Sequence, residues 1–216
     1  MNTSLFEHEI ITEMNSQTKN RYKIMRKFVG NSKEKIILDL GAGPNPLSKN
    51  ALAKKILIHD INNSFTNSPD IIVDLNKKNF PLKNNSVDII IAGEFIEHLL
   101  NPLKFIRECY RILKKGGFMV LSTPNICSFK NRLRVLFGLM PEHCARANEE
   151  GIDTPQTHIK DFNLSFLKYL LEKGGFVINK IGTNGIVFRN KIIFPLFLTP
   201  TIFGEILIIK AIKNEK

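Results

Sequence analysis

Residues 36–45 read IILDLGAGPN, a short run of isoleucine and leucine residues that ends in a glycine loop. The run has the length and the nearly continuous apolar character of a strand that is buried on both faces of a parallel sheet. Gly41 and Gly43 follow it directly, and residues without a Cβ atom permit a tight turn and close approach of backbone amides to a ligand. The stretch therefore predicts a buried strand followed by a loop that binds a nucleotide-like cofactor.

Further apolar runs of strand length follow along the chain, at 56–60, 71–75, 87–91, 118–122, 176–181 and 205–212. Helical periodicity separates several of them. Leu103, Ile106, Tyr110 and Leu113 share one helical face, and another helix is expected at the leucines of 164–171, ended by Gly174 and Gly175. Asn45 and Pro46 offer an N-cap and a first-turn proline for a helix over 47–55.

This alternation predicts the α/β class, with a mostly parallel, doubly wound (Rossmann-like) sheet and helices on both faces. Ligands of such sheets bind at the carboxyl ends of the strands. A length of 216 residues suits a single domain. Within it we expect an N-terminal helical segment (1–34), a cofactor-binding core (35–125), an acceptor-side insertion or lid (126–162), and C-terminal helix and strands (163–216).

The composition restricts partners and location. Lys and Arg number 31 against 20 Asp and Glu, so the net charge of +11 favours anionic partners, although lysines spread over a solvated surface would give the same total. Cys109, Cys127 and Cys144 form no CxxC pair, which indicates a reducing, cytoplasmic location. The N-terminal residues lack the apolar core of a signal peptide. Prolines 195 and 200 interrupt the apolar stretch 192–209, so we interpret it as loop and strand rather than a membrane span.

Aspartates stand at the ends of the first three expected strands. Asp39 precedes the glycine loop, where a carboxylate suits an ammonium or sulfonium cation better than a phosphate. Asp60 and Asp74 end the next two strands, where a carboxylate can accept hydrogen bonds from ribose hydroxyls. A strand-end aspartate is often only a turn residue, but three in succession indicate an adenosine-type ligand. Pro46 stands where a dinucleotide fingerprint needs its third glycine, which disfavours NAD.

A set of motifs in a fixed order connects the chain to a known family. They are ILDLGAG (37–43), Asp60, Asp74, GEFIEHL (93–99) with Asn101 and Pro102, RILKKGG (111–117), STPN (122–125), HIKDF (158–162), and Gly175 with Phe176. Over roughly residues 35–182 this set resembles class I S-adenosylmethionine-dependent methyltransferases, nearest to ubiquinone-biosynthesis O-methyltransferases and glycan or lipid methyltransferases. One departure is Asn45, where loops of this family commonly carry a glycine.

The resemblance implies a seven-stranded sheet with one antiparallel strand, which we place at 205–212. It also implies the cofactor S-adenosylmethionine. Asp39 and the backbone of 41–43 would hold the methionine moiety, Asp60 the ribose, and Asp74 with Leu75 the adenine edge. The full expected cofactor set is Asp39, Leu40, Gly41, Ala42, Gly43, Asp60, Ile61, Asp74, Leu75, Gly93 and Glu94.

His98 and Glu94 are the expected catalytic pair. Their spacing would place them on one helical face, with His98 as general base for a hydroxyl acceptor and Glu94 either orienting it or facing the cofactor. A purely structural Glu–His pair is the alternative. Glu94, Glu97 and His98 could also ligate a divalent ion, as in metal-dependent members of the resembled O-methyltransferases, although we expect a metal-independent reaction.

Acceptor contacts are expected from Asn125, His158 and Phe162, with turn or loop roles as the alternative for Asn125 and His158. In 129–147, Lys130, Arg132 and Arg134 alternate with apolar residues. This pattern fits either a lid helix that touches lipid, making peripheral membrane contact, or a helix packed on the sheet with its basic residues in water, which we favour.

We therefore expect methyl transfer to a small-molecule, glycan or lipid-linked acceptor at a hydroxyl oxygen. A nucleic-acid methyltransferase is the alternative enzyme, and it predicts an acceptor channel lined by lysines. A non-catalytic protein that binds S-adenosylmethionine is the third interpretation.

Overall fold

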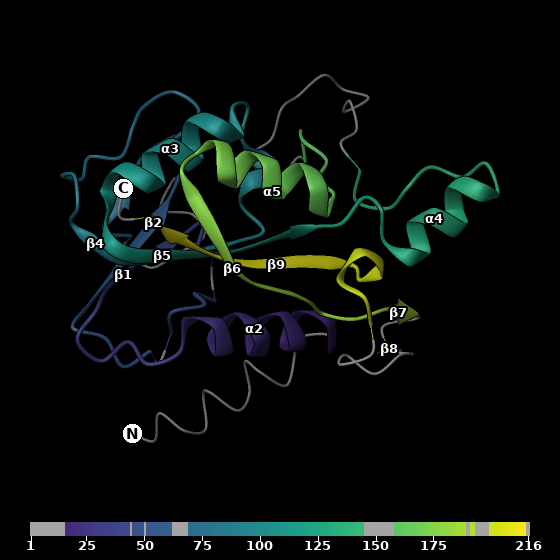
Figure 1. Cartoon of the computed structure of the whole chain (residues 1–216), viewed down its shortest axis with the longest axis horizontal. Coiled ribbons are helices and arrows are strands. Elements are labelled where there is room, and N and C mark those ends of the chain that lie inside the picture. The colour runs from purple at the N-terminus through teal and green to yellow at the C-terminus, as the bar shows by residue number, and fades with distance from the viewer. Residues whose placement is uncertain are drawn as a thin grey trace.

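A computed structural model of the chain describes residues 16–43, 45–49, 51–61, 69–144, 158–188, 191–192 and 199–214. Its main element is a seven-stranded sheet in the order β3-β2-β1-β4-β5-β9-β6 (Figure 1). The strands are β1 (Ile36–Leu40), β2 (Lys55–Asp60), β3 (Ile71–Ile72), β4 (Val87–Gly93), β5 (Leu113–Pro124), β6 (Phe176–Thr183) and β9 (Ile206–Lys213).

The sheet contains one antiparallel strand. β3, β2, β1, β4 and β5 pair in parallel, whereas β9 lies antiparallel to both of its neighbours, β5 and β6. The prediction of seven strands with an antiparallel strand near 205–212 is therefore confirmed. The short strands β7 (Val187–Phe188) and β8 (Lys191–Ile192) form a separate pair.

Helices cover both faces of the sheet. In Figure 1, α3 (Pro102–Ile112) and α5 (Leu164–Lys173) lie on one side and α2 (Ser16–Val29) lies on the other. Successive residues of a strand point to opposite faces, so Ile90 joins the core under α3 and α5 while Ile89 and Ile91 join the core under α2. Both faces of the sheet are buried from solvent, which explains the nearly continuous apolar character of the strands.

Asparagine caps fix where two helices begin. The Asn101 side chain accepts a hydrogen bond from Lys104 N (3.0 Å) at the start of α3, and Asn163 accepts one from Phe166 N (2.8 Å) at the start of α5. Within the described residues, no helix is both long and apolar enough to cross a bilayer.

The helix predicted over 47–55 is wrong. The described residues there form turns and extended chain, and β2 already begins at Lys55. Ser48 N donates instead to the Asp39 carboxylate of β1 (2.7 Å), and Lys54 N donates to Lys35 O just before β1 (2.9 Å). These two hydrogen bonds connect the segment to β1 in place of the hydrogen bonds of a helix. A tertiary hydrogen bond thus overrides the local capping signal.

Two other boundaries differ from those expected. The strand predicted at 71–75 ends at Ile72, because Asp74 begins a turn by accepting from Asn76 N (2.9 Å). The helix in 129–147 is α4 (Phe129–Leu136), which projects from the body of the molecule rather than packing on the sheet. The interpretation that we favoured for this segment is therefore wrong.

Candidate cofactor and active site

Two adjoining cavities lie at the carboxyl ends of β1, β2 and β4. The larger has a volume of about 420 Å³ and the smaller about 230 Å³, and Gly41 and Gly93 line both. Every residue of the expected cofactor set lines one cavity or the other. The larger is lined by Gly41, Gly43, Asp60, Ile61, Asp74, Leu75, Gly93 and Glu94, and the smaller by Asp39, Leu40, Gly41, Ala42 and Gly93.

The glycine loop bends sharply between the two cavities. Gly41 and Gly43 have φ angles of 56° and 55°, in the left-handed region that favours glycine. A Cβ atom on Gly41 would lie 2.5 Å from Cδ2 of Phe95, whereas one on Gly43 would meet nothing within 4 Å. Gly43 N donates to the Asp60 carboxylate (3.3 Å), which fastens the loop to the end of β2.

Asp60 ends β2 and Asp74 begins a turn, and both line the larger cavity. Asp60 accepts from Gly43 N (3.3 Å) and Ile61 N (2.7 Å), one on each carboxylate oxygen. A carboxylate oxygen can accept a further hydrogen bond, so these contacts leave capacity for a ligand. Asp74 accepts from Asn76 N and forms an ion pair with Lys77 (3.3 Å). The turn role and the ligand role are compatible.

Asp39 is a buried carboxyl beside the smaller cavity. Its side chain is 1% exposed and accepts a hydrogen bond from Ser48 N (2.7 Å). Burial raises the pKa of Asp39 to about 6, although hydrogen bonds to Ser48 and Leu47 partly offset that rise. Arg21 and Tyr22 of α2 line the same cavity. A cation bound there would favour the ionised form of this carboxyl.

Glu94 is held away from the expected catalytic arrangement. Its φ is 52°, and the 3-10 helix η1 (Ile96–His98) begins only two residues later. The prediction that Glu94 and His98 share one helical face is therefore wrong, because the left-handed residue precedes the helix. The Glu94 carboxylate forms an ion pair with the buried guanidinium of Arg21. Sequence reasoning missed Arg21, which reaches the site from α2 on a distant part of the chain.

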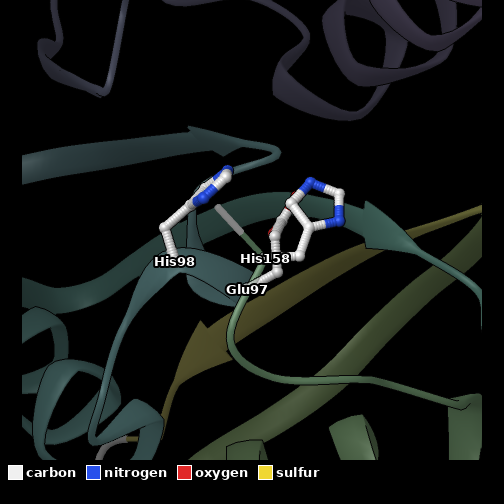
Figure 2. A group of neighbouring side chains, drawn as sticks. All are labelled: Glu97, His98 and His158. Atoms are coloured by element: carbon white, nitrogen blue, oxygen red, sulfur yellow. The ribbon is translucent and has the colours of Figure 1, made fainter. Parts of the chain in front are cut away.

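His98 meets His158, as Figure 2 shows. Their ring centroids lie 4.9 Å apart in an edge-to-face arrangement, and both rings line the larger cavity. The backbone carbonyl of Glu97 accepts from Ile159 N (2.9 Å) and Lys160 N (3.1 Å), which brings the segment carrying His158 against η1. The structure thus pairs His98 with a histidine far along the chain.

Glu97 completes a group that could hold a metal ion. Ligand atoms of Glu97, His98 and His158 lie within 4.8 Å of one another, whereas the expected trio included Glu94, which is paired with Arg21. Glu97 is buried and accepts from Thr123 Oγ1 (2.9 Å). Burial, followed by the charge of Glu94, raises the pKa of Glu97 to about 8, so a cation would have to displace its proton. Metal binding stays the alternative to the metal-independent reaction that we expect.

Asn125 and Phe162 do not line either cavity. The Asn125 amide donates to Ile202 O (3.1 Å) and Gly204 O (2.9 Å), and its oxygen accepts from Cys127 N (3.0 Å), as expected of a turn residue. Phe162 is buried in the core and stacks on Phe166 with ring centroids 5.8 Å apart. Their contact with an acceptor stays a prediction that the site geometry does not support.

His59 is a cavity residue that sequence reasoning missed. It is buried at the end of β2, where Nε2 forms a hydrogen bond with Val73 O (2.9 Å) and the ring meets the edge of Phe95. Burial lowers the pKa of His59, which favours the neutral imidazole. The available signal was a polar residue inside an apolar run, directly before Asp60.

Known proteins resemble this chain in sequence and in fold. The family model described as "Methyltransferase domain" matches residues 14–181. A probable S-adenosylmethionine-dependent methyltransferase of Mycolicibacterium smegmatis is 32% identical over 105 residues, which cover 48% of this chain and 34% of that protein. The mitochondrial ubiquinone biosynthesis O-methyltransferase of Rattus norvegicus is 28% identical over 95 residues, covering 44% of this chain and 26% of that protein.

A solved structure supports the same fold. A SAM-dependent methyltransferase of Thermotoga maritima superposes with a TM-score of 0.66 at 18% identity, over 90% of this chain and 88% of that one. The sequence matches span about a third or less of the length of the two curated relatives. The family match itself extends over most of the 216 residues. The chain therefore belongs to the methyltransferase domain family.

Proposed function

We propose that the chain binds S-adenosylmethionine across the two adjoining cavities and transfers its methyl group to a hydroxyl oxygen of a small-molecule, glycan or lipid-linked acceptor. The observation that carries this proposal is the position of the His98–His158 pair. Both rings line the same cavity as Asp60 and the glycine loop, so a base and the expected cofactor-binding groups share one space.

The residues of the cavities fit this cofactor. Asp39 supplies a carboxyl group beside the smaller cavity and Glu94 supplies one beside the larger, which suits the ammonium and sulfonium charges of the cofactor. Asp60 can accept ribose hydroxyls, and Ile61 and Leu75 offer apolar surface for an adenine ring. When bound, S-adenosylmethionine supplies an already electrophilic methyl group, whose transfer leaves a neutral thioether.

His98 takes the proton of the acceptor hydroxyl in this proposal. An electrophilic methyl group needs little activation, so the protein mainly aligns the acceptor and removes its proton. An imidazole ordinarily exchanges its proton near neutral pH and suits that task. His158 acts as a positioning residue: its ring lies against His98, and its Nδ1 forms a hydrogen bond with His143 O (3.0 Å), which limits the rotation of both rings.

The charge of the lining favours an uncharged acceptor over a nucleic acid. Among the described residues, none that lines the larger cavity is lysine or arginine. A nucleic-acid methyltransferase predicts the opposite, because phosphates need basic partners along the acceptor channel. The name of the ubiquinone biosynthesis relative, an O-methyltransferase, also supports a hydroxyl acceptor.

The first test is isothermal titration of the protein with S-adenosylmethionine and S-adenosylhomocysteine. We expect dissociation constants on the order of micromolar, weakened at least about tenfold by Asp60→Ala. Asp60→Asn is the control, since its amide oxygen still accepts one backbone hydrogen bond and preserves the loop. Absence of binding to the unmodified protein would overturn the proposed function.

The second test concerns His98, with hydroxylated aromatics and sugars as acceptors. His98→Ala should lower kcat about a hundredfold or more while the affinity for S-adenosylhomocysteine stays unchanged. A chelator should leave turnover of the unmodified protein intact if His98 acts as a base. Loss of turnover on chelation, restored by added Mg²⁺ or Mn²⁺, would favour the metal interpretation of Glu97, His98 and His158.

A further inference from the structure

The helix α4 projects from one end of the molecule (Figure 1). Large hydrophobic side chains that are 41% to 76% exposed gather on α4 and the turn after it. We call these residues the apolar tip: Leu133, Val135, Leu136, Phe137, Leu139 and Met140. Contiguous exposed apolar surface on a soluble domain marks a contact with another apolar body.

A polar base gives the projection a fixed shape. The Asn131 side chain accepts from Glu142 N (2.8 Å) and donates to Glu142 O (3.3 Å). Lys130 and Arg134 form ion pairs with the Glu142 carboxylate, and Arg134 Nε donates to Met140 O (2.8 Å). These polar contacts therefore hold the two ends of the tip together.

The backbone at the summit of the tip has its donors satisfied internally. Phe137 N donates to Leu133 O (3.1 Å), Gly138 N to Val135 O (3.0 Å), and Leu139 N to Arg134 O (2.8 Å). Gly138 has a φ of 70°, a left-handed conformation that allows the helix to end in this tight turn. An apolar phase excludes segments with unpaired amides, since each one costs several kcal/mol there. The N–H groups of residues 137–139 meet that condition.

Charge identifies the partner. We propose that the apolar tip inserts into the headgroup boundary of an anionic lipid bilayer. Lys130, Arg132 and Arg134 lie on α4, where Glu142 forms ion pairs with Lys130 and Arg134, and the whole chain carries a net charge of +11. Basic residues beside an apolar surface that enters the boundary are the combination that binds anionic lipid. A second copy of this chain would bring a like charge of +11 instead.

The proposal concerns where the protein works and does not depend on its acceptor or on methyl transfer. The chain contains no tryptophan, so Phe137→Trp introduces a single reporter. On vesicles of phosphatidylcholine and phosphatidylglycerol in about equal amounts, its emission should shift to shorter wavelength and be quenched by brominated lipid. Leu52→Trp is the matched control, because Leu52 is 77% exposed but lies in the loop before β2.

Sedimentation with the same vesicles measures the contribution of the tip. Leu136→Ser combined with Phe137→Ser should weaken binding at least about tenfold, since two large side chains lose their transfer from water, while Leu52→Ser should not. Thermal unfolding checks that each variant folds. Three outcomes would overturn the proposal: no shift of the tryptophan at position 137, equal binding to pure phosphatidylcholine, or a concentration-dependent shift without vesicles that matches dimer formation.

Discussion

Asp39 is a buried residue whose ionised form is unfavourable for the fold but suits a cationic ligand. Its carboxyl is buried against the end of β1 with Ser48 N as a hydrogen-bond donor, and its pKa is raised to about 6. A neutral side chain would satisfy the fold better. An ionised one matches the cationic ligand that we propose for the smaller cavity.

This conflict has a pH signature. The folded pKa lies above the ordinary value of 3.8, so the stabilising contribution of protonated Asp39 is complete at low pH and is lost as pH rises through about 6. Relative to Asp39→Asn, which stays neutral, the free energy of unfolding should fall by about 2 to 3 kcal/mol between about pH 4 and about pH 7. Urea unfolding of both proteins across this range measures the difference. Parallel pH profiles would contradict the burial of a titrating carboxyl.

The glycine loop allows two similar substitutions to be compared at the scale of an element. Gly41→Ala and Gly43→Ala both place a Cβ atom at a positive φ, which costs roughly 1 to 2 kcal/mol in each case. Only the Cβ at position 41 also meets the Phe95 ring. Gly41→Ala should therefore lose more stability and more affinity for S-adenosylhomocysteine than Gly43→Ala. Urea unfolding and titration measure the two losses.

Phe95→Ala provides the check on that explanation. Combined with Gly41→Ala, it removes the ring atoms that the new methyl group meets, so part of the additional loss should be recovered. The same combination with Gly43→Ala should give only the sum of the two separate losses. Equal recovery in both backgrounds would show that backbone strain, and not contact with Phe95, controls the loop.

Strands were predictable from the sequence wherever both faces of the sheet are covered. β1, β4 and β9 are continuous apolar runs because helices pack on each side, and that pattern survives in the sequence alone. The helix expected over 47–55 failed because Ser48 bonds to a carboxyl on β1, a tertiary contact that local propensity does not contain. α4 likewise exposes its apolar residues where periodicity predicted a packed face.

The candidate site was predictable only in part, for a reason of topology. Parallel strands bring their carboxyl ends to one edge, so the glycine loop, Asp60 and Asp74 could be assembled from strand order alone. Arg21 and His158 come from outside that repeating pattern and meet Glu94 and His98 through packing. No spacing rule connects residues from separate layers of a fold.

Residues of α2 and of the carboxyl ends of the strands line the cavities together, so ligand binding should stabilise the whole molecule. At about a hundred times its dissociation constant, S-adenosylhomocysteine should add about 2.7 kcal/mol to the free energy of unfolding. For a chain of this length that corresponds to a rise in Tm of about 5 to 10 °C. Differential scanning calorimetry measures it. NAD at the same concentration should give no rise, and an equal rise with NAD would contradict the interpretation of Pro46 in the loop.

The place of β9 also decides when the sheet can be completed during synthesis. In the sheet, β6 pairs only with β9, which lies between it and β5. Residues 176–183 therefore leave the ribosome with no strand to join until residues 206–213 have followed them. A nascent chain halted between these points exposes the edge of β5 and the unpaired β6, both of which invite aggregation. The sheet can accordingly be completed only after residues 206–213 have been synthesised.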